Sequence, residues 1–206
     1  MAISLSLRRS FGILFLVVAT ELIGFGLIIP VLPQLALQFN VSSALIGVLM
    51  GAFSFAQFIA APFLGALSDR YGRKPVLVLS KIGTVIAYVI MAKSQSYGWF
   101  LISRLLDGFT GGNIAVARAY VSDITTSETR SQGMAVIGIS FGVGFLLGPI
   151  LGGILYTDTM AYAVAAWVAA GLSLLAAFLT FFLLKEPKTH REMRSGMALL
   201  RSGWTS

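Results

Sequence analysis

The sequence predicts an all-α integral membrane protein with six transmembrane helices, and three observations lead to this prediction. Of its 206 residues, 57% are hydrophobic and only 11% are charged. Soluble domains carry roughly 25% charged residues, so this chain has too few charges to cover a water-exposed surface. The apolar residues fall into long stretches, and most positive charges lie between those stretches. A lipid bilayer is therefore the expected surroundings.

The apolar stretches are long enough to cross a membrane. A spanning helix needs about 20 mostly apolar residues. The third stretch is short and is interrupted by Lys81, whereas the second, fifth and sixth contain no charged residue. We predict a six-helix bundle over residues 1–188, followed by a basic cytoplasmic tail over 189–206. The predicted helices are 11–32, 44–67, 76–92, 97–121, 133–156 and 161–184.

Lysine and arginine residues predict the orientation, because they are enriched in cytoplasmic loops. If all six stretches span, one side of the membrane carries only Lys93, and the other carries eleven basic residues. Both termini are therefore expected in the cytoplasm, in the plasma membrane of a prokaryote. The first stretch is too long for a signal peptide, and no small-residue cleavage site follows it. The eleven are Arg8, Arg9, Arg70, Arg73, Lys74, Arg130, Lys185, Lys188, Arg191, Arg194 and Arg201.

The composition also excludes several classes of function. There is no cysteine, and the single histidine, His190, lies in the tail, so we expect neither a metal site nor an organic cofactor. No pattern indicates a catalytic nucleophile with its base, so we expect no enzyme. The basic residues mark a membrane face, so we expect no nucleic-acid partner.

The first stretch contains a carboxylate, Glu21, near its middle. A charged side chain at this depth is costly and usually faces a cavity or a partner. Because burial disfavours the charged form of a carboxylic acid, Glu21 is a candidate proton carrier. A structural hydrogen bond between helices is the alternative interpretation.

The fourth stretch carries Arg104 and Asp107, which are three residues apart and can pair on one helix face. Helical periodicity adds Gly111 and Arg118 to the same predicted stripe. The pair is a candidate part of the proton-coupling site or a structural ion pair. We expect Arg118 and Lys81 to extend toward the membrane interface.

Other polar, aromatic and small residues interrupt the apolar pattern. Gln57 and Asn113 are candidates for hydrogen bonds between helices or for contact with a substrate, and Phe25 is a candidate cavity residue. The fifth stretch holds glycines four apart, which permit close helix contact, with a proline that can kink the helix. These are Gly144, Gly148, Pro149, Gly152 and Gly153.

The segment Gly65-Ala-Leu-Ser-Asp69-Arg70-Tyr-Gly72-Arg73-Lys74-Pro-Val-Leu77 resembles the signature that major facilitator superfamily transporters carry between their second and third helices. The family pattern is G-x-L-x-D-R-x-G-R-[KR]-x-x-L. Arg104-Leu-Leu-Asp-Gly108 resembles the family's R-x-x-x-G motif. The segment 144–153 is similar to the family's antiporter signature, with Ala135 where that signature has another glycine.

Residues 21–33 resemble the first helix of drug/proton antiporters, which usually have Asp where this chain has Glu21. The resemblance covers roughly residues 10–188 and is closest to tetracycline and multidrug exporters. It implies the N-terminal half of the fold, built as a 3+3 inverted repeat. It also implies that Asp69, Arg73 and Asp123 form a conformational latch. Tetracycline exporters carry an acid in the middle of the third helix, where this chain has Ala87 and Tyr88, which argues against tetracycline as the substrate.

The resemblance favours proton-coupled export of small hydrophobic or cationic molecules, driven by the proton gradient through alternating access. The alternatives are a metabolite uniporter or symporter, and a non-transporting half that needs a partner. Because the family places its site between two six-helix bundles, we expect a second half: the missing C-terminal bundle or another copy of this chain.

Overall fold

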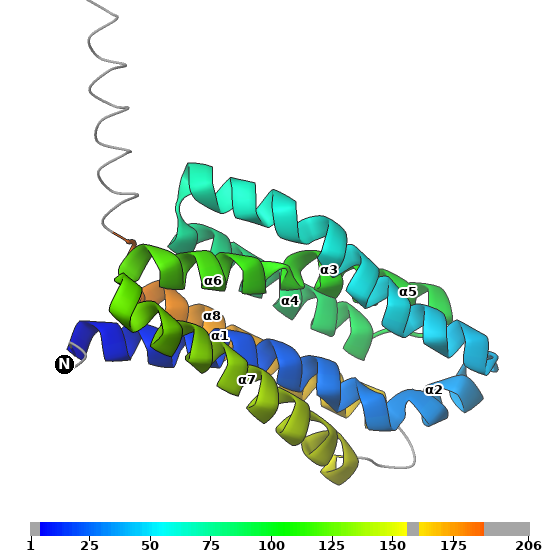
Figure 1. Ribbon diagram of the computed structural model, residues 1–206. Helices are drawn as coiled ribbons and strands as arrows, with labels where there is room; N and C mark the ends of the chain where they lie inside the picture. The colour runs from blue at the N-terminus through cyan, green and yellow to red at the C-terminus, as the bar shows by residue number, and fades with distance from the viewer. Residues whose placement is uncertain (1–4, 156–160, 188–206) are drawn as a thin grey trace, which may run out of the picture.

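The computed structural model describes residues 5–155 and 161–187, and within these ranges the chain consists of helices joined by short connections, without strands. The helices run roughly along one axis as a bundle (Figure 1). The predicted basic tail, 189–206, lies outside the described residues. In chain order the elements are α1 (Leu5–Ile28), a 3-10 turn η1 (Ile29–Val31), α2 (Leu32–Gln38), α3 (Ser43–Tyr71), α4 (Arg73–Ala92), α5 (Tyr97–Gly111), α6 (Asn113–Ile124), α7 (Ser127–Ile154) and α8 (Ala161–Leu183).

Five helical stretches in the described residues are long and apolar enough to cross a membrane. They are Leu7–Gln38, Ser43–Tyr71, Arg73–Ala92, Ser127–Ile154 and Tyr162–Leu183. The fourth predicted helix, 97–121, is divided at Gly112 into α5 and α6, which follow one another along the bundle (Figure 1).

The helix division has a local cause at Gly111 and Gly112. Glycine is a poor helix former, and Gly112 has a helical φ of −61° but a ψ of 2°, which departs from the helical value. A side chain on Gly112 would also collide with α3, because its Cβ would lie 2.9 Å from a Leu64 methyl carbon. The two glycines therefore interrupt the helix where the chain packs against α3.

Proline determines how the first helix ends. The predicted helix 11–32 is observed as α1, which stops at Ile28, followed by the turn η1 and the short helix α2. Pro30 and Pro33 lack the backbone N–H that a regular helix requires. At the other end α1 begins at Leu5, because polar residues extend the helix beyond its apolar run.

Glycines bring α1 and α7 into close contact. The α carbons of Gly26 and Gly148 face each other so closely that a Cβ on Gly148 would lie 2.7 Å from the Gly26 α carbon. Gly144 meets Leu22 of α1, and Gly152 meets the Leu27 carbonyl. The glycine spacing predicted from the sequence thus serves backbone approach between these two helices.

The apolar core consists of two clusters with polar residues between them. One cluster includes Leu14, Val17 and Leu77, and the other includes Leu27 and Met91. On α1 and α4 the boundary between these clusters falls near Glu21 and Lys81, respectively. The bundle therefore places its buried charges in the middle of its length.

Basic residues gather at one end of the bundle, which we call the basic end. Here α1, α4 and α7 begin and α3, α6 and α8 end (Figure 1). The opposite end carries Lys93 between α4 and α5. This arrangement follows from antiparallel neighbours joined by short connections.

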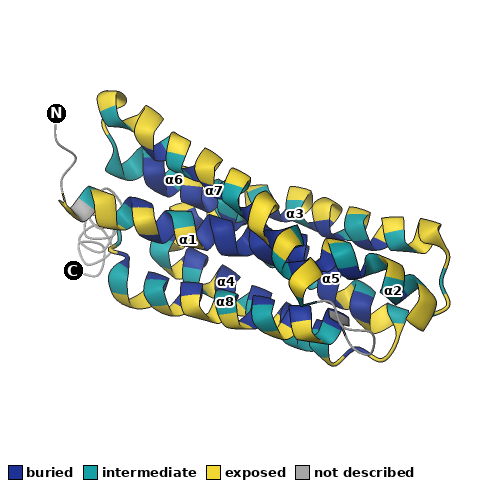
Figure 2. Cartoon of the chain, turned by 90° about the horizontal axis from the view of Figure 1, so that it is seen from below, coloured by how far each residue is buried: buried dark blue, intermediate teal, exposed yellow. Residues whose placement is uncertain are grey.

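The outward faces of several helices are apolar. Along α3, exposed positions recur over its whole length (Figure 2), and they include Phe55, Phe58 and Phe63. Helix α8 exposes Phe178, Phe181 and Phe182. In water such surfaces would be unfavourable, whereas lipid or another helix bundle can cover them.

The contact between α1 and α7 can be tested with two matched glycine variants. Gly148→Ala should lower the free energy of unfolding by about 1–3 kcal/mol, because the new methyl group meets the Gly26 backbone. Gly142→Ala, on the same helix, has nothing within 4 Å of its Cβ and should be neutral or slightly stabilising. Thermal unfolding of the purified protein in detergent measures both, and equal effects would contradict the contact.

Candidate functional site

The carboxylate of Glu21 lies in the centre of the bundle and is 2% exposed. Helix α1 presents it toward α4 and α6 rather than toward the lipid-facing side. A buried carboxylate away from water is unfavourable unless charge and hydrogen bonds compensate it. Its surroundings supply both.

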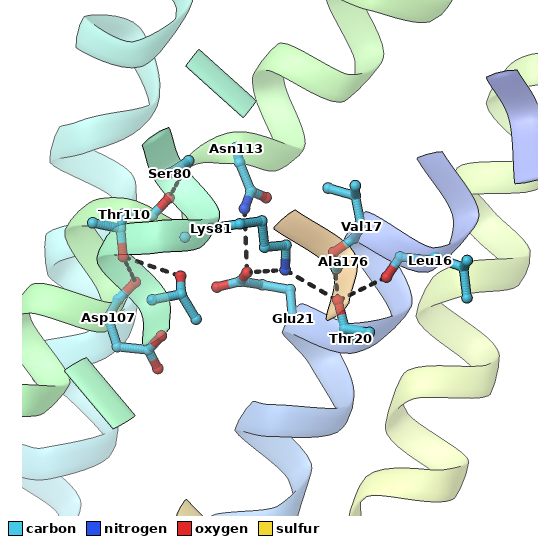
Figure 3. Close-up of polar contacts among 12 residues, drawn as sticks. Leu16, Val17, Thr20, Glu21, Ser80, Lys81, Asp107, Thr110, Asn113 and Ala176 are labelled. Atoms are coloured by element: carbon cyan, nitrogen blue, oxygen red, sulfur yellow. Dashed lines mark hydrogen bonds and ion pairs between the residues drawn. The ribbon is translucent and has the colours of Figure 1, made fainter. Parts of the chain in front are cut away.

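The principal partner of Glu21 is Lys81 on α4. The Lys81 ammonium nitrogen lies 2.7 Å from Glu21 Oε2, and both side chains are almost completely buried. The same ammonium donates a hydrogen bond of 3.2 Å to the Thr20 hydroxyl. Figure 3 shows the ion pair bridging α1 and α4. Each charge compensates the burial of the other.

Asn113 completes the surroundings of this carboxylate. Its amide nitrogen donates to Glu21 Oε2 at 3.2 Å (Figure 3). Among the described residues, the other oxygen, Glu21 Oε1, has no hydrogen-bond partner. This oxygen lies against Gly111, where an added Cβ would be 2.6 Å away. Among the described residues, one carboxylate oxygen thus has two partners and the other has none.

The prediction for Lys81 was wrong: its side chain is buried within the bundle and does not extend to the interface. The apolar run begins near Val76, but α4 begins at Arg73. Lys81 therefore lies about 12 Å along the helix axis from the helix start, far enough inside for its ammonium to meet Glu21. A lysine and a glutamate that both interrupt apolar stretches were the signal for this pair.

Arg104 and Asp107 form a second buried ion pair, as their spacing predicts, with 2.6 Å between Arg104 Nη2 and Asp107 Oδ2. The Arg104 guanidinium carbon also lies 5.5 Å from the ring centre of Phe53 and 5.4 Å from that of Tyr88. Aromatic faces favour a cation at such distances. The predicted stripe does not extend to Arg118, which is exposed on α6 because the chain bends at Gly112.

The predicted cavity residues have observed contacts within the bundle. Gln57 donates to the Gly111 carbonyl oxygen at 2.9 Å, which joins α3 to the end of α5. Phe25 is half-buried and packs on Phe53 with 4.9 Å between the ring centroids, and on Phe145 at 6.2 Å. These residues surround the central charges; whether they also touch a substrate stays a prediction.

A separate charge cluster lies at the basic end and is centred on Arg73. Its guanidinium is 2.7 Å from an Asp69 carboxylate oxygen and 2.8 Å from Asp123 Oδ2. It also donates to the Ser68 hydroxyl at 2.6 Å. The structure therefore brings together the three residues that the sequence motif predicted as a latch, from α3, α4 and α6.

Other residues of the motif lie around this cluster. Arg70 is exposed, with its guanidinium 5.5 Å from the ring centre of Tyr71. Gly65 has no neighbouring atom within 4 Å of where a Cβ would be placed. Among the glycines of α7, Gly153 likewise has open space, unlike Gly144, Gly148 and Gly152.

Sequence reasoning missed Glu186, which follows α8. Its carboxylate accepts the Arg73 backbone N–H at 2.6 Å and the Lys74 backbone N–H at 3.0 Å. These are two of the unpaired N–H groups at the start of α4, and a negative charge there is favourable. Gly72 permits this approach, since its Cβ would lie 2.7 Å from Glu186 Oε1.

The sequence model of the Major Facilitator Superfamily matches residues 14–206. The chain belongs to this superfamily of transporters. It is therefore a transport protein component and not an enzyme. The segment between α3 and α4 that resembles the family signature lies within the matched residues, and Asp69 and Arg73 of this segment belong to the Arg73 cluster described above.

Two curated relatives show which members of the superfamily this chain is similar to. The chain is 39% identical over 186 residues to the class C tetracycline resistance protein of Escherichia coli, a match that covers 88% of this chain and 46% of the relative. It is 35% identical over 201 residues to human major facilitator superfamily domain-containing protein 10, covering 84% and 44%. The chain thus spans a little under half the length of these relatives.

Solved structures of superfamily members share the fold. The human organic anion transporter MFSD10 superposes with a TM-score of 0.76 at 34% identity, covering 87% of this chain and 48% of that one. The proton:xylose symporter XylE gives a TM-score of 0.83 at 15% identity, covering 91% and 46%. The bundle is one half of the superfamily fold, as the sequence predicted.

Two glycines of one motif test the junction between α3 and α4. Gly72 has φ 105° and ψ 154°, a conformation essentially limited to glycine and costing other residues about 1–3 kcal/mol. Gly72→Ala should therefore lower the unfolding temperature and displace Glu186. Gly65→Ala, with open space around it, should not. Circular dichroism during heating compares them, and a Gly72→Ala protein as stable as the parent would refute the account of this junction.

Proposed function

We propose that this chain forms one half of a proton-coupled antiporter that exports small hydrophobic or cationic molecules. The observation that supports this most strongly is the buried Glu21 carboxylate, which pairs with Lys81 and leaves Oε1 without a partner among the described residues. The relatives named as tetracycline resistance proteins agree with export. The proton gradient supplies the energy, and no organic cofactor is required.

In the proposed mechanism, a proton and the substrate compete for Glu21. Protonation removes the negative charge and leaves the Lys81 ammonium buried without its partner, which is unfavourable. A rearrangement of α1 and α4 that relieves this cost would then lower the free energy of the protein. Differential stability of this kind between two states is what a conformational switch requires. A cationic or hydrogen-bond-donating substrate can instead bind the free oxygen of Glu21.

The second buried ion pair contributes to the electrostatic field around Glu21. Arg104 and Asp107 compensate one another, so the four buried charges sum to zero when every group is ionised. Adding one proton at Glu21 makes the centre positive, which would repel a cationic substrate. This electrostatic exclusion is the simplest physical basis for exchanging a proton against a cation.

We further propose that the Arg73 cluster is a latch for the basic end. In the described arrangement, Arg73 contacts Asp69 and Asp123 while Glu186 holds the start of α4. These contacts join α3, α4 and α6, so a rearrangement among those helices would have to break some of them. Breaking them in one state only would make the latch state-dependent.

The transporter needs a second six-helix half. The family builds its central site between two bundles, and the exposed apolar face of α3 is available for such a contact. The partner is either a C-terminal half or a second copy of this chain. We propose that a single copy of the 206 residues does not transport by itself.

Neutralising the proposed proton carrier should abolish coupling. In proteoliposomes that contain the assembled transporter, Glu21→Gln should reduce substrate-induced proton release to background. The reason is that a side-chain amide does not bind and release a proton near neutral pH as a carboxylate can. Glu21→Asp should keep partial activity. The matched control is Glu128→Gln, at an exposed position at the start of α7, which should couple normally.

The readout is a pH-sensitive dye trapped in the vesicles, together with substrate flux down its own gradient. Preserved proton release in the Glu21→Gln protein would reject the role of Glu21. Substrate exchange that never moves protons, even in the parent, would instead favour a uniporter.

The orientation is tested with single cysteines, since the chain has none of its own. We propose that the basic end faces the cytoplasm, following the distribution of Lys and Arg. Gln95→Cys lies in an exposed loop at the opposite end, and Ser127→Cys is exposed at the basic end. A membrane-impermeant maleimide added to whole cells should label Gln95→Cys only, and labelling of Ser127→Cys would reverse the orientation.

A further inference from the structure

A large cleft at the basic end is separate from the central charges. It has a volume of about 960 Å³ and lies between the start of α1 and the ends of α6 and α8. Its lining combines apolar and basic side chains. The charged residues of the described lining are Arg9, Lys74, Lys185 and Glu186.

Three cations line this cleft: Arg9 on α1, Lys74 on α4 and Lys185 after α8. Within residues 5–155 and 161–187, none of the three forms an ion pair with a carboxylate. The Lys74 ammonium instead lies 5.4 Å from the ring centre of Phe181. The cleft therefore gathers positive charge from three separate segments.

Glu186 is the single acid among the described residues of the lining, and it does not cancel these charges locally. Both oxygens of Glu186 accept backbone N–H groups at the start of α4, from Arg73 and Lys74. Their negative charge is directed at the helix terminus, where it is already favourable. Three cations and one acid give the described part of the lining a net charge of +2.

Hydrogen bonding fixes the inner part of the cleft. The Tyr120 hydroxyl on α6 donates to the Lys185 carbonyl oxygen at 2.5 Å. This contact ties the end of α8 to α6, and Glu186 ties the next residue to α4. Lys185 is thereby held in place through its backbone, while its side chain remains exposed.

The remaining lining is apolar and continues onto the outer surface of α8. Leu183 and Ile124 are half-buried, whereas Phe182 is 61% exposed. The apolar lining contributes no binding free energy for an inorganic anion. It does so for an anionic amphiphile, whose head group contacts the cations while its acyl chains cover apolar surface.

We propose that this cleft binds the head group of one anionic phospholipid, with its acyl chains along α8. Basic pockets between transmembrane helices at the cytoplasmic side suit such head groups. The site has its own charges and contacts, so it does not depend on Glu21 or on proton coupling. Its position at the cytoplasmic leaflet follows from the orientation proposed above.

The test is lipid retention by the purified protein, measured by native mass spectrometry after titration with phosphatidylglycerol or phosphatidylcholine. The parent should retain one phosphatidylglycerol and no phosphatidylcholine. The triple variant Arg9→Gln, Lys74→Gln and Lys185→Gln should bind phosphatidylglycerol about 100-fold more weakly. The control Arg8→Gln, Arg118→Gln and Arg130→Gln removes the same charge from exposed positions outside the cleft lining, and it should bind like the parent.

Each remaining outcome contradicts the proposal. Equal losses in the two triple variants would indicate general electrostatic attraction, and unchanged binding in the first would place the lipid elsewhere. Displacement of the lipid by excess inorganic phosphate would indicate a general anion site. If the triple variant fails to fold, the single variants Arg9→Gln and Lys185→Gln replace it, because both side chains are exposed. Each should weaken phosphatidylglycerol binding measurably. Normal binding by both would overturn the assignment.

Discussion

The ion pair between Glu21 and Lys81 is the constraint around which the bundle is arranged. Two charges that are almost fully buried need good mutual geometry and additional hydrogen bonds to be stable. Here Thr20 and Asn113 supply such bonds, while Glu21 Oε1 has no partner among the described residues. That requirement fixes how α1 faces α4, and it brings Asn113 of α6 to the same carboxylate. The apolar clusters on either side keep water away and strengthen the interaction. A site of this kind is costly to form, and a change in its protonation has large structural consequences.

Close backbone contacts hold the rest of the bundle so that this pair can form. On one side α1 meets α7 through Gly26 and Gly148, and on the other the bend at Gly112 lets the chain pass α3. At the basic end, Arg73 and Glu186 join four helices around the start of α4. The central charges and the basic end are connected through α4, which carries Lys81 and begins at Arg73. A rearrangement of α4 would therefore affect both regions.

The sequence was sufficient for the family and the helical architecture, and its long local motif pointed to Asp69 and Arg73, which lie in the charge cluster at the basic end. It was insufficient for Lys81, whose depth depends on where α4 begins, and that start lies among charged residues outside the apolar run. Glu186 was missed because capping of α4 by a residue more than a hundred positions later leaves no local pattern. The division at Gly112 was signalled by two consecutive glycines, but only the packing against α3 explains it. The pattern of a single sequence does not show which distant segments are in contact.

A double-mutant cycle on Glu21 and Lys81 tests the central claim most directly. The proteins are the parent, Glu21→Gln, Lys81→Met and the double variant, with the free energy of unfolding measured in detergent at neutral pH. Each single variant leaves one buried charge without its partner and should lose about 3–5 kcal/mol. The double variant leaves neither charge and should recover most of that loss. Additive losses in the double variant would show that the two side chains do not depend on each other, and would contradict the account.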